Sequence, residues 1–120
     1  MYKIIFYTDK RGRSEVGEYI ANLQKKSDKD SKIKVNKIVS YIDMLSEKGI
    51  KLGQKYVKHL RNDIWELRPL RDRILFAYIS NNIYILLNVF VKKTQKTPES
   101  EIKKAEQLLK DFISRRDLDG

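Results

Sequence analysis

The stretch that decides the fold is residues 64–91, which read IWELRPLRDRILFAYISNNIYILLNVFV. It is rich in β-branched, aromatic and leucine residues, and two turn signals interrupt it, one around Pro69 and one at Ser80-Asn81-Asn82. Such residues favour strands, and asparagine pairs favour hairpin loops. The stretch therefore predicts antiparallel strands over 64–68, 73–79 and 83–91. The last of these is apolar at nearly every position and is expected in the sheet interior, covered on both faces.

Upstream of this stretch, the sequence predicts two more strands and two helices. Residues 56–60 form an extended segment that Asn62-Asp63 joins to the strand from Ile64, and residues 2–8 form a first strand. Between them, a charged break over 25–32 separates two helical patterns, and Gly49 is the expected stop of the second. Their apolar positions are Val16, Tyr19, Ile20 and Leu23 in the first helix, and Val35, Ile38, Val39, Ile42 and Leu45 in the second.

Downstream, a basic loop over 92–97 leads into a final helix. Pro98, Glu99 and Glu101 are typical of a helix start, since proline fits the first turn and carboxylates favour the positive end of the helix dipole. Its expected buried face is Ile102, Ala105, Leu108, Leu109, Phe112 and Ile113. The order of elements predicts the α+β class in a single domain over 1–120, with an N-terminal strand and helical hairpin packed on a central antiparallel sheet and a C-terminal helix.

The charge balance favours a polyanionic partner. Lys and Arg total 26 against 16 Asp and Glu, which gives a net charge of +10 with the histidine neutral. Lysines and arginines that neutralise phosphates release condensed counterions, so RNA is a natural partner. An acidic protein would satisfy the same field. A membrane surface fits less well, because no stretch pairs a basic face with a bare apolar face.

Composition also excludes several kinds of site. The chain has no cysteine and one histidine, which excludes disulfide scaffolds, thiolate chemistry and multi-histidine metal cages, so we expect no metal and no cofactor. The N-terminus has too short an apolar run for a signal peptide, and residues 83–91 are far short of a membrane span. We therefore expect a cytoplasmic protein.

Strand alternation predicts which charged side chains share a face. Glu66 and Arg68 point to the same side of one strand, as do Arg71 and Arg73 of the next. If 83–91 pairs antiparallel with 73–79, Lys92-Lys93 lies beside Arg73. We therefore expect one exposed edge of the sheet to gather Lys58, His59, Glu66, Arg68, Arg73, Lys92 and Lys93.

Such a cluster suits cleavage of RNA by its own 2′-hydroxyl group, which needs cations around the phosphorane, a base and an acid. Arginine forks fit phosphate oxygens, while Glu66, His59 or a lysine crowded by other cations could accept the proton. We expect the Arg73 side chain to be exposed, so that Arg73→Ala abolishes activity and leaves the fold intact. Each residue also fits an ordinary solvated position, so the residues alone indicate a basic α+β domain that binds RNA or an acidic partner.

The segments 56–60, 64–69, 73–76 and 85–98, followed by Glu101-Ile102 and Ala105, resemble in order and spacing the phage-derived, Gp49-like branch of the RelE/ParE superfamily, which contains the HigB toxins. The resemblance covers the C-terminal two-thirds, and the N-terminal third agrees in architecture. It implies a RelE-like fold and the toxin of a type II toxin–antitoxin system. It also implies a ribosome-dependent mRNA endonuclease, or mRNA interferase, that inhibits translation and causes growth arrest.

The resemblance also implies residue roles and partners. Arg73 and Lys93 match its catalytic arginine and its basic residue after the last strand, and Arg68 matches the arginine that closes the E-L-R segment. Together with the proton-transfer candidates, the expected catalytic set is Arg73, Lys93, Arg68, Glu66 and His59, and the expected RNA-binding set is Lys58, Arg71, Lys92 and Lys96. The implied partners are mRNA, the ribosome and a helix-turn-helix (HigA-like) antitoxin, with promoter DNA bound only through the antitoxin complex. The alternative is a non-enzymatic module, either a gyrase-directed (ParE-like) inhibitor or a nucleic-acid binder; the retained cations favour the nuclease.

Overall fold

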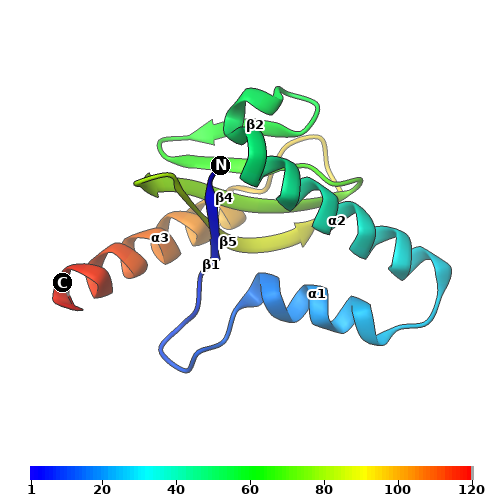
Figure 1. Ribbon diagram of the computed structural model, residues 1–120, viewed down its shortest axis with the longest axis horizontal. Coiled ribbons are helices and arrows are strands. Elements are labelled where there is room, and N and C mark those ends of the chain that lie inside the picture. Colours follow the sequence, from blue (N-terminus) through cyan, green and yellow to red (C-terminus); the bar gives the residue numbers. More distant parts are fainter. Residues whose placement is uncertain (120) are drawn as a thin grey trace.

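The molecule is a sheet with helices on both faces (Figure 1). The computed structural model describes residues 1–119. In chain order, its elements are β1 (Lys3–Phe6), α1 (Glu15–Lys25), α2 (Lys29–Lys48), the short 3₁₀ helix η1 (Gly49–Leu52), β2 (Val57–Arg61), β3 (Ile64–Leu67), β4 (Asp72–Ser80), β5 (Ile83–Val91) and α3 (Glu99–Asp119). The α+β class predicted from the sequence is confirmed.

Strands β2 to β5 form an antiparallel meander, and β1 completes the five-stranded sheet in the order β1-β5-β4-β3-β2. β1 lies parallel to β5, with Lys3 opposite Ile83. β5 is therefore an interior strand, and its buried run agrees with the expectation for 83–91. The parallel pairing of β1 was not part of the sequence expectation, because strand propensity does not name a partner.

The helical hairpin covers one face of the sheet. Figure 1 shows α1 and α2 meeting near the loop that joins them and diverging from it, while the last turns of α3 project past the strands. The first core joins α1 and α2 to the strands, and its buried members are Val16, Leu23, Ile38, Tyr41, Leu45, Val57, Leu67, Ile74, Phe76, Tyr84, Leu86 and Val89. The expected face of α2 was partly wrong: Val39 is 41% exposed, and Tyr41 is buried where it packs against Tyr56.

The second core lies under α3. It consists of Tyr7, Ile64, Leu75, Ala77, Ile85, Leu87, Ala105 and Leu109. Ile113, expected in the buried face of α3, is 42% exposed. It lies toward the end of the helix, which passes beyond the sheet (Figure 1).

Caps and turns follow the sequence signals. The Ser14 and Asp28 side chains accept hydrogen bonds from the backbone N–H groups of Gly17 and Ser31, at 3.0 and 2.9 Å, and so cap α1 and α2. Gly49 ends α2 with a positive φ of 61°. Two of the three predicted turns between strands carry asparagine in the left-handed region, Asn62 in one and Asn81-Asn82 in the other. Within residues 1–119, no helix is long and apolar enough to cross a membrane.

Candidate active site

The basic residues before β4 and after β5 line one pocket at an end of the sheet. The antiparallel register sets Asp72 opposite Val91 and Arg73 opposite Phe90, so the beginning of β4 lies beside the end of β5. The pocket, which we call the cationic pocket, has a volume of about 510 Å³ and is lined by Leu70, Arg71, Arg73, Lys92, Lys93, Thr94 and Gln95. None of its lining residues is acidic. The sheet register thus brings together Arg73 and the lysine pair, as strand alternation predicted.

Arg73 is the innermost cation of this pocket. Its Nη1 donates to the backbone oxygens of Leu70 and Asp72 at 2.9 and 2.8 Å. Its Nε is buried without a hydrogen-bond partner among the described residues, 3.8 Å from Glu66 Oε2. Burial lowers the pKa of the guanidinium, the Glu66 carboxylate opposes this shift, and neighbouring Arg68 adds to it.

The expectation that the Arg73 side chain is exposed was wrong, since the residue is only 7% exposed. Two backbone carbonyls and a carboxylate draw the guanidinium inward, and none of them can be foreseen from strand alternation. Removing a buried cation leaves Glu66 with less compensation, so Arg73→Ala is not a neutral change for the fold.

Glu66 is the buried anion behind Arg73. It is 2% exposed, and its Oε1 accepts a hydrogen bond of 2.6 Å from the hydroxyl group of Thr97. Its Oε2 lies 3.5 Å from the Nε of Arg68, whose Nη1 donates to the Gln54 carbonyl at 2.8 Å. A buried carboxylate is stable only when it is paired in this way. Glu66 thereby links β3 and β4 to the loop that carries the lysine pair.

The neighbouring strand β2 divides the remaining candidates between the two faces. Lys58 is opposite Glu66 and exposed, on the same side as the cluster. His59 is opposite Trp65, with the ring centroids 5.0 Å apart, and its Nε2 lies 2.6 Å from the Asn62 carbonyl oxygen. The expected convergence of His59 with the other residues was therefore wrong, because adjacent residues of a strand point to opposite faces.

The basic loop after β5 places its residues differently. Lys92 and Lys93 line the cationic pocket, whereas Lys96 does not, although it lies in the same loop. The loop is anchored at its start by the Lys92 N–H group, which donates to the Arg71 carbonyl at 2.8 Å, and at its end by Thr97. Sequence reasoning missed Thr97, because nothing about a threonine before a proline indicates that its hydroxyl donates to a buried carboxylate.

A second buried carboxylate ties the helical hairpin to the turn before Arg73. Asp72 is fully buried, and its Oδ1 accepts from the Tyr19 hydroxyl at 2.7 Å and lies 3.3 Å from the Lys34 ammonium nitrogen. Its own backbone oxygen is one of the two that hold Arg73. The position of Arg73 therefore depends on contacts made by α1 and α2 as well as by the sheet.

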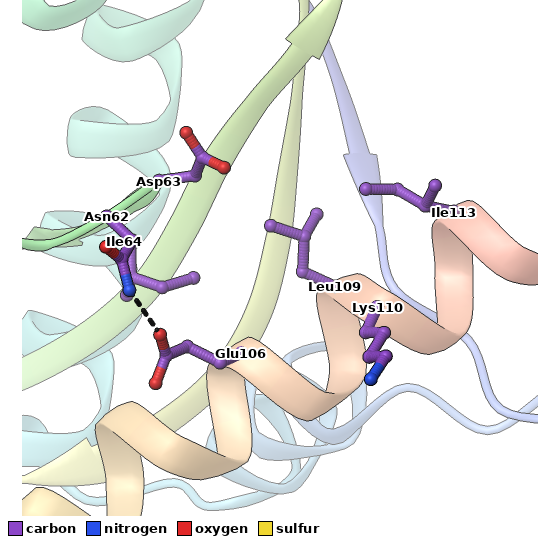
Figure 2. Close-up of a pocket in the computed structure, with 7 residues that line it drawn as sticks. All are labelled: Asn62, Asp63, Ile64, Glu106, Leu109, Lys110 and Ile113. Carbon is purple, nitrogen blue, oxygen red and sulfur yellow. Dashed lines mark hydrogen bonds between the residues drawn. The ribbon is translucent and has the colours of Figure 1, made fainter.

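A second groove, of about 390 Å³, lies between the β2–β3 turn and α3, and Figure 2 shows the side chains that line it. Ile64 and Leu109 form its apolar side, and the Asn62 amide donates to Glu106 at 2.9 Å. Its other lining residues are Asp63, Lys110 and Ile113. The groove shares no lining residue with the cationic pocket, and it sets a single lysine beside Asp63 and Glu106, so the chemistry of phosphate binding points to the cationic pocket.

Comparison with known proteins gives the family of the chain. Residues 18–110 match the model of the family described as phage derived protein Gp49-like (DUF891), a range that contains Glu66, Arg68, Arg73, Lys92 and Lys93. No match was found among curated proteins. This family is one of RelE/HigB-like toxins and indicates a toxin that acts in a toxin–antitoxin pair. Since the match spans most of the chain, the protein belongs to the Gp49-like family of phage-derived proteins.

Proposed function

We propose that this protein is the toxin of a type II toxin–antitoxin system and that it is an endoribonuclease that cuts mRNA at the ribosome. The observation that carries the proposal is the Arg73 guanidinium, buried at the back of a pocket that Arg71, Lys92 and Lys93 also line. A fixed group of cations in a partly water-excluded site stabilises the charge that develops on a phosphorane. Family membership supports the toxin role.

The bonds that form and break belong to the RNA, and the groups that assist are side chains of this chain. The 2′-oxygen attacks the adjacent phosphorus, the bond to the 5′-oxygen breaks, and the products are a 2′,3′-cyclic phosphate and a 5′-hydroxyl end. Arg73 and Lys93, which both line the pocket, stabilise the non-bridging oxygens. Lys92 and Arg71 hold the flanking phosphates, and Lys58 extends the positive surface beside Glu66. No step is assigned to a metal ion or a cofactor.

Proton transfer falls to a lysine in this proposal. Glu66 is buried, accepts from Thr97 and lies beside two arginines, which suits the positioning of Arg73 better than contact with a 2′-hydroxyl. His59 is on the other face of the sheet. Lys92 and Lys93 line the pocket itself, so one of them takes the proton of the 2′-hydroxyl and returns one to the departing 5′-oxygen.

The proposed partner is an antitoxin with a helix-turn-helix fold, of the HigA type, that binds promoter DNA on behalf of the complex. The family indicates an antitoxin partner. With a net charge of +10, the toxin favours an acidic antitoxin segment. The same charge speeds approach to the RNA of the ribosome.

The test compares wild type with Arg73→Lys and Arg73→Ala, and with Lys110→Gln from the groove of Figure 2 as the control. Arg73→Lys keeps a cation but loses the fork that holds two carbonyls and a phosphate. We expect growth arrest and 5′-hydroxyl ends in codon phase for wild type and control. Cleavage should fall by about 10²- to 10³-fold in both Arg73 variants. Circular dichroism and thermal melting show whether each variant is folded.

Wild-type toxicity in a folded Arg73→Lys variant would overturn the nuclease proposal. Breaks in double-stranded DNA, with no new RNA ends, would support the gyrase-directed alternative. Purified toxin added to ribosomes engaged on mRNA, and separately to free mRNA, tests the ribosome dependence.

A further inference from the structure

Leu70 occupies a backbone conformation that does not suit it. It follows Pro69 in the turn between β3 and β4, which the Asp72 N–H group closes by donating to the Pro69 carbonyl at 3.0 Å. The φ angle of Leu70 is 56°, in the left-handed region where the Cβ of an L residue crowds its own backbone. A leucine in this region is strained, and such strain persists where the side chain has a use.

The other positions with positive φ show which residue types this backbone conformation favours. Within residues 1–119, the other positions with positive φ are all asparagine or glycine: Asn62, Asn81, Asn82, Gly12, Gly49 and Gly53. The backbone task of Leu70 is to offer its carbonyl oxygen to Arg73, and an asparagine or glycine would do this with less strain. Backbone geometry therefore does not explain a leucine here.

Core packing does not explain the leucine either. Leu70 is 46% exposed and belongs to neither core. It is the one aliphatic side chain among the residues that line the cationic pocket, next to Arg71 and Arg73 and together with Lys92, Lys93, Thr94 and Gln95. An apolar group at a site built for phosphate points to a ligand with an apolar part.

We propose that Leu70 forms the apolar side of a nucleobase subsite within the cationic pocket. The proposal rests on the nuclease function proposed above, because it places a phosphate at Arg73 and Lys93. The base of the same nucleotide then lies within the pocket, whose volume of about 510 Å³ is in the range of small-ligand sites. The face of that base packs against Leu70, which removes apolar surface of both partners from water.

Gln95 supplies the polar part of the same subsite. Its amide offers both a donor and an acceptor, as the edge of a base requires, whereas Thr94 already donates its hydroxyl to the Lys96 carbonyl. Leu70 thus sets how well a base is held, and Gln95 sets which base is preferred.

The test uses Leu70→Asn and Leu70→Met in purified toxin added to ribosomes engaged on mRNA. Asparagine tolerates the left-handed region and lacks the apolar surface, so the melting temperature should stay equal or rise while cleavage falls about tenfold. Methionine keeps the apolar surface and the strain, so both values should stay near those of wild type. Gln95→Ala should change the distribution of bases at the cut positions with a small change in total rate.

The outcomes separate this proposal from the one on which it rests. If Arg73→Lys is inactive while Leu70→Asn cuts at the wild-type rate and positions, the base subsite is wrong and the nuclease stands. A clear fall in the melting temperature of Leu70→Asn along with activity would show a structural role and overturn the subsite. If the wild-type protein does not cut RNA, both proposals fail.

Discussion

At the scale of single residues, Glu66 organises the site. One buried carboxylate accepts from Thr97 and lies beside the guanidinium groups of Arg68 and Arg73. Strand alternation predicted that Glu66 and Arg68 share a face, because the side-chain period of a strand is two residues. Alternation says nothing about depth, so the sequence did not show that Glu66 and Arg73 are buried. Depth depends on what covers a strand, and here the loop that ends at Thr97 lies against Glu66.

Replacing Thr97 by valine tests this contact. The change removes the hydroxyl at nearly constant volume and leaves one carboxylate oxygen without its 2.6 Å hydrogen bond. A hydrogen bond to a charged group contributes about 1.5–3 kcal/mol, so the free energy of unfolding in urea should fall by that amount. Cleavage should also fall, since the loop that carries Lys92 and Lys93 loses its second anchor. Thr97→Ser keeps the hydroxyl and should retain most of both properties.

Thr94→Val is the matched control from the same loop. The Thr94 hydroxyl donates to the Lys96 carbonyl at an exposed position, so its loss should change stability by less than about 0.5 kcal/mol. Equal losses of unfolding free energy in Thr94→Val and Thr97→Val would contradict the view that the hydrogen bond to Glu66 stabilises the fold.

At the scale of elements, local signals predicted where helices and strands begin and end. Gly49 ends α2 as predicted, and asparagines mark two of the hairpin turns, whereas the cap residue Asp28 lies within the stretch that was expected only to break the helices. The faces were harder to predict. Spacing assigned Val39 to the buried side of α2, but Tyr41 lies there because it packs against Tyr56 from a later segment. Likewise, nothing in the sequence pairs Tyr19 with Asp72, although their hydrogen bond ties α1 to β4.

The cap of α2 predicts a pH dependence of stability. Hydrogen bonds from the backbone N–H and the hydroxyl of Ser31 lower the pKa of Asp28 below its ordinary 3.8. A lowered folded-state pKa means that the stabilisation is complete above pH 3.8 and is lost as pH falls through the folded value. Asp28→Ala should therefore lower the melting temperature at neutral pH, and its difference from wild type should shrink in stronger acid.

Asp28→Asn separates the cap from the charge. The asparagine oxygen still accepts from the Ser31 N–H group but does not titrate, so this variant should keep its advantage over Asp28→Ala in acid. Thermal melts of the three proteins across acidic pH measure this. A difference between wild type and Asp28→Ala that stays constant as pH falls well below 3.8 would contradict the assignment.

At the scale of the whole molecule, part of the positive charge gathers around one pocket that no acidic residue lines. The register of β4 and β5 gathers Arg71, Arg73, Lys92 and Lys93 around this pocket. The nearness of Arg73 to the two lysines followed from the sequence once antiparallel pairing was assumed, whereas Arg71 was not part of the expected cluster. The sequence failed for His59, which inferred strand pairing grouped with the cluster, because His59 lies opposite Trp65 on the other face of the sheet.

The grouping of cations around the cationic pocket predicts how the binding of RNA depends on salt concentration. Each phosphate contact contributes about 0.7 to the slope of log binding constant against log salt concentration for a single strand. Lys93→Gln should reduce that slope by about this amount with an RNA whose 2′-hydroxyls are methylated to prevent cleavage. Lys110→Gln, in the groove of Figure 2, should weaken binding less and leave the slope nearly unchanged. Equal slopes for Lys93→Gln and wild type would place the RNA elsewhere.

The parallel pairing of β1 with β5 has a consequence for when the sheet can form. Lys3 lies opposite Ile83, so this contact closes a loop that contains the helical hairpin and three other strands. Closing so long a loop costs chain entropy, and contacts between distant segments slow folding. During synthesis, β1 leaves the ribosome before β5 does, so Ile4 and Ile5 lack their strand partner until β5 has been made. The finished sheet, and the pocket at the end of β5, therefore exist only after most of the chain has left the ribosome.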